Sequence, residues 1–384
     1  VRGKRGHAEM HAVDACTPAP TSIGLQNHLR SRHHLGYAAH RQHRCRFKFG
    51  ANWHSSPAAA AVLQQADYLT IWLGPPSERY GARFNRYWHG RMLDYALSHN
   101  TTVVYYAYII AGLARQVAGL RDCDVSDSSS TSLCVHGADF IRHHAPQILD
   151  LYSHFANETA SRLGRSSDTV WLIEPDWYQY SQEGQQGGGL TQDAMVSLYD
   201  QISCRIRSYL PRARLSIDVS PWATDQDAWL TPFLKNIQID FLHTSGGQSA
   251  GNSTFVRPDP HHHVTWRDLQ RIGGGRGIIA DTGYGVGGRA AGSVGWLNAD
   301  SLGQRVAEGV VALSIAHVSH EWVQRVKKLR QRLPPAGTCM LTRASANQSR
   351  SGGLTRSGAF ARSSLSRPKA NRTARAGSGA LQRL

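Results

Sequence analysis

The feature that most constrains the fold is an alternation of short apolar segments with longer amphipathic ones, from about residue 67 to residue 320. The short segments are rich in β-branched and aromatic residues, and we expect strands over 66–74, 102–110, 169–174, 215–219, 237–242 and 276–281. The longer segments have helical spacing, and we expect helices over 88–99, 137–163, 190–209, 229–236 and 301–316. This pattern predicts an α/β fold, most simply a distorted parallel β/α barrel, with an open doubly wound sheet as the competing topology.

The positive charge of the chain lies at its two ends. The net charge is +16, yet residues 51–321 hold 20 Lys or Arg against 25 Asp or Glu, and no acidic residue follows Glu321. We therefore expect residues 1–50 to be a disordered basic and His-rich segment, 51–333 to form the barrel, and 334–384 to be a disordered Ser/Arg-rich tail. A nucleic-acid arm is the functional alternative for such tails, but no aromatic or Gly interleaving in them suggests a binding register, so we expect no nucleic-acid partner.

Two features of the middle region favour an oxidising compartment. Cys123 and Cys134 are spaced as in a short-loop disulfide, and glycosylation sequons occur at Asn100, Asn157 and Asn252. No apolar run of 18 residues suggests a membrane span. We expect a secreted or extracellular protein that is monomeric and has no membrane partner.

Carboxylates and aromatic residues recur where the predicted strands end. In a β/α barrel the active site gathers at that edge. Trp and Tyr rings stack on the apolar faces of sugars while acidic oxygens accept hydrogen bonds from hydroxyls. The set therefore predicts a polysaccharide-binding site, although any single member could instead pack in the core or cap a helix. Its candidate members are Tyr106, Tyr108, Glu174, Asp176, Asp218, Asp240, Asp281, Trp222, Trp229 and Trp296.

Other candidate sites have weaker support. The histidines at 261–263 lack a spaced cysteine or carboxylate partner, so we expect no metal site. The glycine runs at 273–277 and 283–288 lack the strand–GxGxxG–helix context of a phosphate loop and are better read as turns. Cys204 has no histidine signature of a thiol nucleophile, and His243 could contact sugar or be a hydrogen-bonded core residue. No metal or organic cofactor is expected.

A series of motifs between about residues 100 and 298 resembles glycoside hydrolase family 6, the inverting cellulases and cellobiohydrolases. The motifs are, in order, YYAYII, GLRDCDV, WLIEPDWYQY, LSIDVSPW, IIADTGYGVGG and GWLN. The resemblance implies hydrolysis of a β-linked glucan with inversion, with Asp176 as the general acid and Asp122 assisting the acid or holding the water. It also implies that Tyr106 or Tyr108 lies under the distorted sugar and that Trp222, Trp229 and Trp296 line the cleft.

The chain departs from that family in three places. Cys134 lies much closer to Cys123 than the family's partner cysteine does, which implies a different disulfide. Trp296-Leu297-Asn298 lacks the family's cysteine, and nothing after it matches the family's last strand, with its Gly-Glu-Cys-Asp segment. We therefore expect that strand to be replaced or lost. The rival hypothesis is a barrel that binds polysaccharide but has lost hydrolysis together with the last carboxylate.

Overall fold

The computed structural model describes Cys16 and the ranges 46–53, 62–74, 83–123, 131–182, 187–244, 249–257, 264–282, 293–316 and 319–333. The predicted disordered tail at 334–384, most of the predicted segment at 1–50, the histidines at 261–263 and the glycine run at 283–288 lie outside the described residues. The chain divides after Thr342 into two units, and the second unit, Arg343–Leu384, also lies outside them.

The described strands close into a parallel barrel in which each pairs with the next and β8 pairs with β1. They are β1 (Lys48–Asn52), β2 (Tyr68–Leu73), β3 (Thr102–Ala107), β4 (Thr169–Ile173), β5 (Arg214–Asp218), β6 (Phe241–Thr244), β7 (Gly277–Thr282) and β8 (Val310–Ile315). The predicted β/α barrel is therefore confirmed, and the open sheet is excluded.

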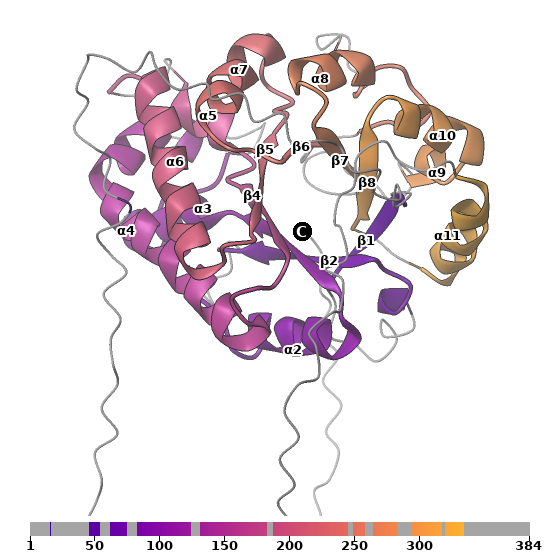
Figure 1. Cartoon of the computed structure of the whole chain (residues 1–384). Helices are drawn as coiled ribbons and strands as arrows, with labels where there is room; N and C mark the ends of the chain where they lie inside the picture. The colour runs from indigo at the N-terminus through magenta and orange to yellow at the C-terminus, as the bar shows by residue number, and fades with distance from the viewer. Residues whose placement is uncertain are drawn as a thin grey trace, which may run out of the picture. The chain divides into compact units, whose positions relative to one another are not determined.

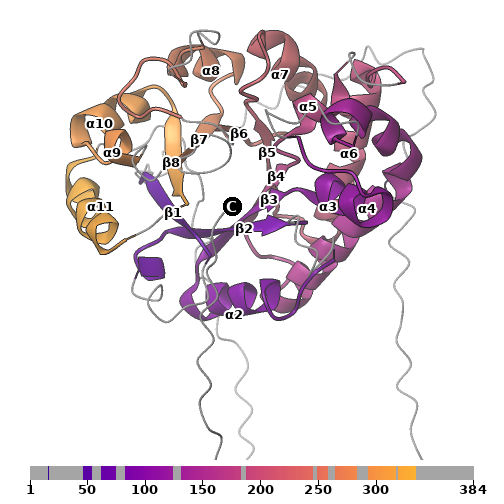
Figure 2. The same ribbon diagram turned by 180° about the vertical axis from the view of Figure 1, so that it is seen from behind.

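Helices surround this ring of strands, as both views of the ribbon show (Figures 1 and 2). The longest, α4, contacts α2, α3, α5 and α6. The described helices are α2 (His89–His99), α3 (Ile109–Ala118), α4 (Leu133–Leu163), α5 (Trp177–Ser181), α6 (Gln192–Tyr209), α7 (Gln226–Asn236), α8 (Trp266–Ile272), α9 (Ser293–Trp296), α10 (Ala299–Ala307) and α11 (His320–Arg332). Helices cover the outer faces of the strands, so β4, β7 and β8 are buried along their whole length.

Two sequence predictions of element type were wrong in part. The strand expected over 102–110 ends at Ala107, and Ile109 already begins α3. The helix expected over 301–316 ends at Ala307, and Val310–Ile315 is the barrel's last strand, reached through Gly309 with φ +92°. A continuous apolar run is compatible with a buried strand or a buried helix, so periodicity could not separate the two. The barrel's last strand is therefore present, and VVALSI stands where the family that the sequence resembles has its Gly-Glu-Cys-Asp segment.

The first strand begins before the predicted domain boundary at residue 51. β1 starts at Lys48 and lies between β2 and β8, so it completes the barrel. A side chain at Gly50 would collide with the ring of Tyr68, because a Cβ there would lie 2.0 Å from that ring. The short segment KFGAN carries too little pattern to be recognised as a strand from sequence.

Two disulfides are present among the described residues. Cys123 pairs with Cys134, which confirms the predicted short-loop bridge. Cys204 on α6 pairs with Cys16, 188 residues earlier in the chain, and so it is not a free thiol nucleophile. Disulfides of this kind persist in oxidising compartments, which is compatible with an extracellular protein. No helix among the described residues has the length and apolar character needed to cross a membrane.

Candidate active site at the carboxyl edge of the barrel

Four of the predicted carboxylates lie at or near one edge of the barrel. Glu174 and Asp176 directly follow β4, Asp218 is the last residue of β5, and Asp281 lies near the end of β7. Asp122 comes from the segment between α3 and α4, and it lies close enough to Asp176 for its negative charge to raise the pKa of that residue. Residues that are up to 159 positions apart in the sequence therefore share one acidic site.

Asp176 occupies the position immediately before α5 and is partly exposed as a residue. Burial raises the pKa of its carboxyl group well above the usual value, and the negative charges of Asp122, Asp218 and Glu174 raise it further. The hydroxyl group of Tyr108 donates a hydrogen bond to this carboxyl, which opposes the rise. The balance keeps Asp176 protonated at a pH where an ordinary aspartate is charged.

Asp122 is linked to α5 by a hydrogen bond from a tyrosine. The hydroxyl group of Tyr180 donates to Asp122 Oδ1 at 2.5 Å, and the backbone N–H of Cys123 donates to the same oxygen at 2.8 Å. Donors of this kind favour the charged form of a carboxylate. The neighbouring Cys123–Cys134 disulfide ties this segment to α4.

The carboxyl of Asp281 is held inside the barrel mouth by two side chains. Tyr106 Oη donates to Asp281 Oδ1 at 2.5 Å, and His243 Nε2 lies 3.1 Å from the same oxygen. All three residues are at least 98% buried. His243 on β6 is therefore part of a hydrogen-bonded buried cluster, and it also lies 3.4 Å from Ser216 Oγ.

Sequence reasoning did not identify Arg257, a buried cation at this edge. It follows β6 in the chain, is 8% exposed, and is stabilised in its charged form by Asp218 and Asp281, while burial lowers its pKa. An arginine so placed balances part of the negative charge of two buried carboxylates. The surrounding sequence, STFVRPDP, has no periodicity or motif that marks this residue as different from a surface arginine.

Aromatic rings form a stack beside the carboxylates. The ring of Trp72, on β2, lies 5.1 Å from that of Tyr106 and 4.9 Å from that of Tyr108, with interplanar angles of 23° and 25°. Trp72 is partly exposed, whereas the two tyrosines are buried. The stack fixes the orientation of Tyr108, whose hydroxyl group reaches Asp176.

The three predicted cleft tryptophans have different environments. Trp222 follows β5 and is 37% exposed. Trp229 packs edge-on against Tyr178 and donates from its indole N–H to the carbonyl of Asp218, and Trp296 is fully buried against Trp266. The prediction that Trp229 and Trp296 line the cleft is not supported by their burial, since both rings pack against neighbouring elements.

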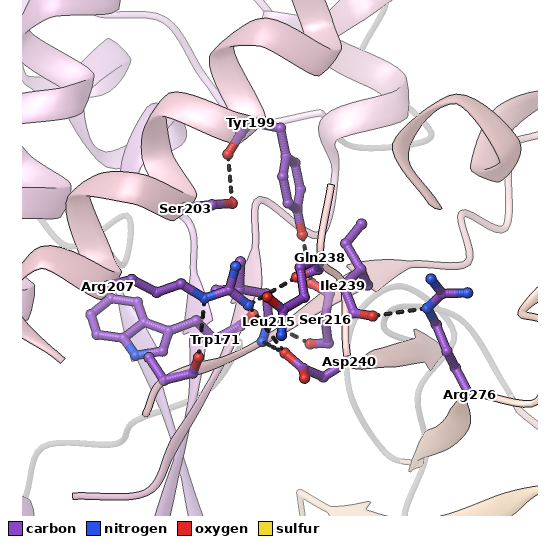
Figure 3. A network of polar contacts seen from close by, with 11 residues as sticks. Trp171, Tyr199, Ser203, Arg207, Leu215, Ser216, Gln238, Ile239, Asp240 and Arg276 are labelled. Atoms are coloured by element: carbon purple, nitrogen blue, oxygen red, sulfur yellow. Dashed lines mark hydrogen bonds and ion pairs between the residues drawn. The ribbon is translucent and has the colours of Figure 1, made fainter. Parts of the chain in front are cut away.

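Glu174 and Asp240 also differ from expectation. Glu174 is fully buried, and its carboxyl turns toward α3 and α4. Asp240 precedes β6, because that strand begins at Phe241 instead of residue 237. It therefore lies at the amino edge of the barrel, where it belongs to the polar network of Figure 3.

Among the described residues no group of three or more His, Cys, Asp or Glu side chains is arranged to hold a metal ion. A small hollow adjoins Arg257, and it is lined by Val219, Ser220, Gln226, Val256, Arg257 and Val264. The hollow reaches Ser220, whose hydroxyl oxygen accepts a hydrogen bond from the backbone N–H of Trp222. The exposed tryptophan is thus anchored at the edge of this hollow.

Comparisons with known proteins give the following. No family model matches the chain, so the resemblance to glycoside hydrolase family 6 stays a prediction, and no curated protein matches it. Similar solved structures include an endo-1,4-beta-xylanase from Caldicellulosiruptor owensensis, which is 9% identical with a TM-score of 0.42 and covers 71% of this chain and 86% of its own.

Two further structures are comparably similar. The catalytic domain of an endoglucanase from Thermobifida fusca is 11% identical with a TM-score of 0.41, over 72% of this chain and 79% of its own. A GH26 beta-mannanase from Bacteroides ovatus is 11% identical with a TM-score of 0.48, over 77% and 92%. Likeness at this level does not determine a reaction, and the chain is assigned to the β/α barrels on its own strand pairing.

Proposed function

We propose that the chain is a secreted glycoside hydrolase that cleaves a β-linked glucan with inversion, with Asp176 as the general acid. The observation that carries the proposal is the environment of Asp176. Asp176 lies at the carboxyl edge of the barrel and is partly exposed as a residue, and the pKa of its carboxyl is raised by burial and by three neighbouring carboxylates. A general acid must be protonated near the working pH and within reach of solvent and substrate.

Inversion needs two carboxyl groups with different protonation states. Asp176 gives its proton to the glycosidic oxygen as the bond from that oxygen to the anomeric carbon breaks. A second, ionised carboxylate takes a proton from the water that attacks the same carbon from the opposite face. We assign Asp122 the supporting role, either by assisting the acid or by holding the water, because Tyr180 and the N–H of Cys123 stabilise its charged form.

The side chains around the acid favour a neutral sugar chain. Trp72 and Trp222 are aromatic residues at this edge with part of their surface open, and such rings stack on the apolar faces of pyranoses. Among the described residues of this edge, the carboxylates outnumber the buried arginine Arg257, so a substrate that carries its own negative charges would be repelled.

The second candidate function is a barrel that binds polysaccharide without cutting it. One observation favours this alternative: β8 and the residue after it, VVALSIA, contain no carboxylate. The family that the sequence resembles carries an acidic residue in the corresponding last strand. If that residue is indispensable as a base, this chain binds its ligand without hydrolysis.

The two functions are separated by assaying the full chain, expressed with disulfides allowed, on a panel of β-glucans. We expect release of reducing ends, and we expect Asp176→Asn to lower kcat by roughly 10³-fold. Asp150→Asn is the matched control, because it makes the same chemical change at an exposed position on α4. No release from any glucan, with the wild-type protein still retained on an insoluble glucan, would support the binding barrel instead.

A further inference from the structure

Glu174 has an unusual backbone conformation for its residue type. It follows β4 directly and has φ +44°, in the left-handed region that non-glycine residues seldom adopt. Its N–H still donates to the carbonyl of Ala107 at 3.0 Å, so the backbone remains tied to the end of β3. Such a conformation is unfavourable for a non-glycine residue and persists only where surrounding contacts hold it.

The contacts that hold Glu174 come from two helices. Oε1 accepts hydrogen bonds from the backbone N–H groups of Ile109 at 2.8 Å and Ile110 at 3.0 Å, which open α3. It also accepts one from Tyr152 Oη, on α4, at 2.7 Å. First-turn N–H groups lack partners within their helix, and a carboxyl group satisfies them well. The left-handed turn is what points Glu174 at the start of α3.

The same two segments meet a second time. Tyr108 immediately precedes Ile109, and its hydroxyl group donates to Asp176, two residues after Glu174. The turn from Glu174 to Asp176 is therefore linked at both ends to the segment from Tyr108 to Ile110. A shift of the start of α3 would move Tyr108 away from Asp176.

We propose that Glu174 is a positioning residue that acts on Asp176 through Tyr108. Its carboxyl holds the start of α3 in the place from which the Tyr108 hydroxyl group reaches the acid. This inference rests on the proposed function of Asp176 as the general acid. It gives Glu174 a role without substrate contact, in agreement with its complete burial.

The test compares kcat and KM for Glu174→Ala, Tyr108→Phe and the double variant in the full chain. We expect Glu174→Ala to lower kcat by about 10²-fold and to leave KM nearly unchanged, because a small displacement of a catalytic group has an effect of this size. Because both single changes act on one hydrogen bond, the double variant should be no slower than Glu174→Ala alone. Additive losses in this double-mutant cycle would overturn the proposal.

The pH profile separates positioning from a purely electrostatic effect. The Tyr108 hydrogen bond lowers the pKa of Asp176, whereas the charge of Glu174 raises it. If Glu174→Ala releases Tyr108, the alkaline limb of kcat should move to higher pH, as in Tyr108→Phe. A move to lower pH would show that only the charge of Glu174 matters, and would contradict the positioning role.

Three further variants keep the test decisive if Glu174→Ala does not fold. Glu174→Gln retains an acceptor oxygen for the three donors and should restore most of kcat. Tyr152→Phe removes one hydrogen-bond donor to Glu174 and should lower kcat a few-fold. The alkaline limb of its kcat–pH profile should move to higher pH, as in Tyr108→Phe. Tyr199→Phe is the control: it removes another buried hydroxyl group, one that donates to the carbonyl of Ser216, and should leave the limb in place.

Comparing these variants with Asp176→Asn also distinguishes a failure of this inference from a failure of the proposed function. If Asp176→Asn is as active as the wild-type protein, the assignment of the acid is wrong and the positioning role is rejected with it. If Asp176→Asn is inactive while Tyr152→Phe and Glu174→Ala leave the pH profile unchanged, the acid stands and only the role of Glu174 is rejected.

Discussion

The carboxylates at the two edges of the barrel have different partners. At the amino edge, Asp240 accepts the backbone N–H of Leu215 at 2.9 Å and lies 3.4 Å from the guanidinium group of Arg207 (Figure 3). Asp67, just before β2, similarly accepts the N–H of Phe49 at 2.9 Å and pairs with Arg330 at 2.7 Å. Each of these carboxylates has a basic partner and a backbone donor.

At the carboxyl edge the carboxylates lie near one another. The pKa of Asp176 is raised by burial and by the charges of three other acidic residues, and Arg257 is the buried cation that acts on Asp218 and Asp281. Stability would favour a basic partner for each acid, as at the amino edge. Clustered carboxylates with raised pKa values are a feature of catalytic edges, so the contrast agrees with the proposed function, in which the amino edge contributes stability and the carboxyl edge the chemistry.

The largest expected effect is on how stability depends on pH. Burial raises the pKa of Glu174 to about 8 in the folded protein, whereas the unfolded chain releases this proton near its ordinary pKa of 4.5. The stabilisation of the folded protein by protonated Glu174 is therefore complete below about pH 4.5 and is lost as the pH rises through 8. Between these values the free energy of unfolding falls by at most roughly 1.4 kcal/mol per pH unit. Urea unfolding of Glu174→Gln between pH 5 and pH 8 should show a flatter dependence than the wild-type protein. Parallel curves would mean that Glu174 is already charged in the folded state.

A change at the amino edge should affect stability and spare catalysis. Asp240→Asn removes the charge that pairs with Arg207 and weakens the acceptor for the N–H of Leu215. We expect the free energy of unfolding to fall by about 1–3 kcal/mol, measured by urea denaturation, with kcat of the folded enzyme unchanged. A large loss of kcat in a folded Asp240→Asn protein would remove the distinction between the two edges.

The disulfides offer the same comparison in a covalent form. Replacing Cys123 and Cys134 by serine frees the segment that presents Asp122, and we expect kcat to fall by roughly 10-fold. Replacing Cys16 and Cys204 removes a bridge to α6 and should lower the melting temperature with kcat retained. Equal effects of the two double variants on kcat would show that the position of Asp122 does not depend on its neighbouring bridge.

The smallest expected effect comes from the exposed tryptophan. Trp222→Ala should raise KM for a soluble β-glucan by roughly 3-fold to 10-fold with kcat little changed, since one stacked ring contributes about 1 kcal/mol. Trp229→Ala should instead lower the unfolding free energy, because that ring is 7% exposed and packs between Tyr178 and Phe233. Steady-state kinetics beside thermal melts distinguish the two roles, and a reversed pattern would refute this placement of the aromatic residues.

Much of the barrel could be predicted from local pattern. Periodicity correctly places most of the strands and the helices α2, α4, α6 and α7. Each of these helices buries one apolar stripe and each strand buries one or two apolar faces, and such patterns are visible in the sequence. Prediction failed at Ile109 and Ile110, which continue the apolar run of β3 into α3, and at Val310–Ile315, where nearly every residue is apolar and the run has no period to read. It also missed β1, whose segment KFGAN carries too little pattern to be recognised as a strand.

By itself, the sequence determined the alternation that makes a β/α barrel, the short Cys123–Cys134 loop and the presence of Asp176 after β4. Tertiary structure alone decided which acids become neighbours: it brought Asp122 to Asp176, sent Asp240 to the opposite edge, and placed Arg257 beside Asp218 and Asp281. The physical reason is that hydrophobic periodicity is a local property of the chain. A pKa shift or an ion pair instead depends on distances between segments that only barrel closure brings together.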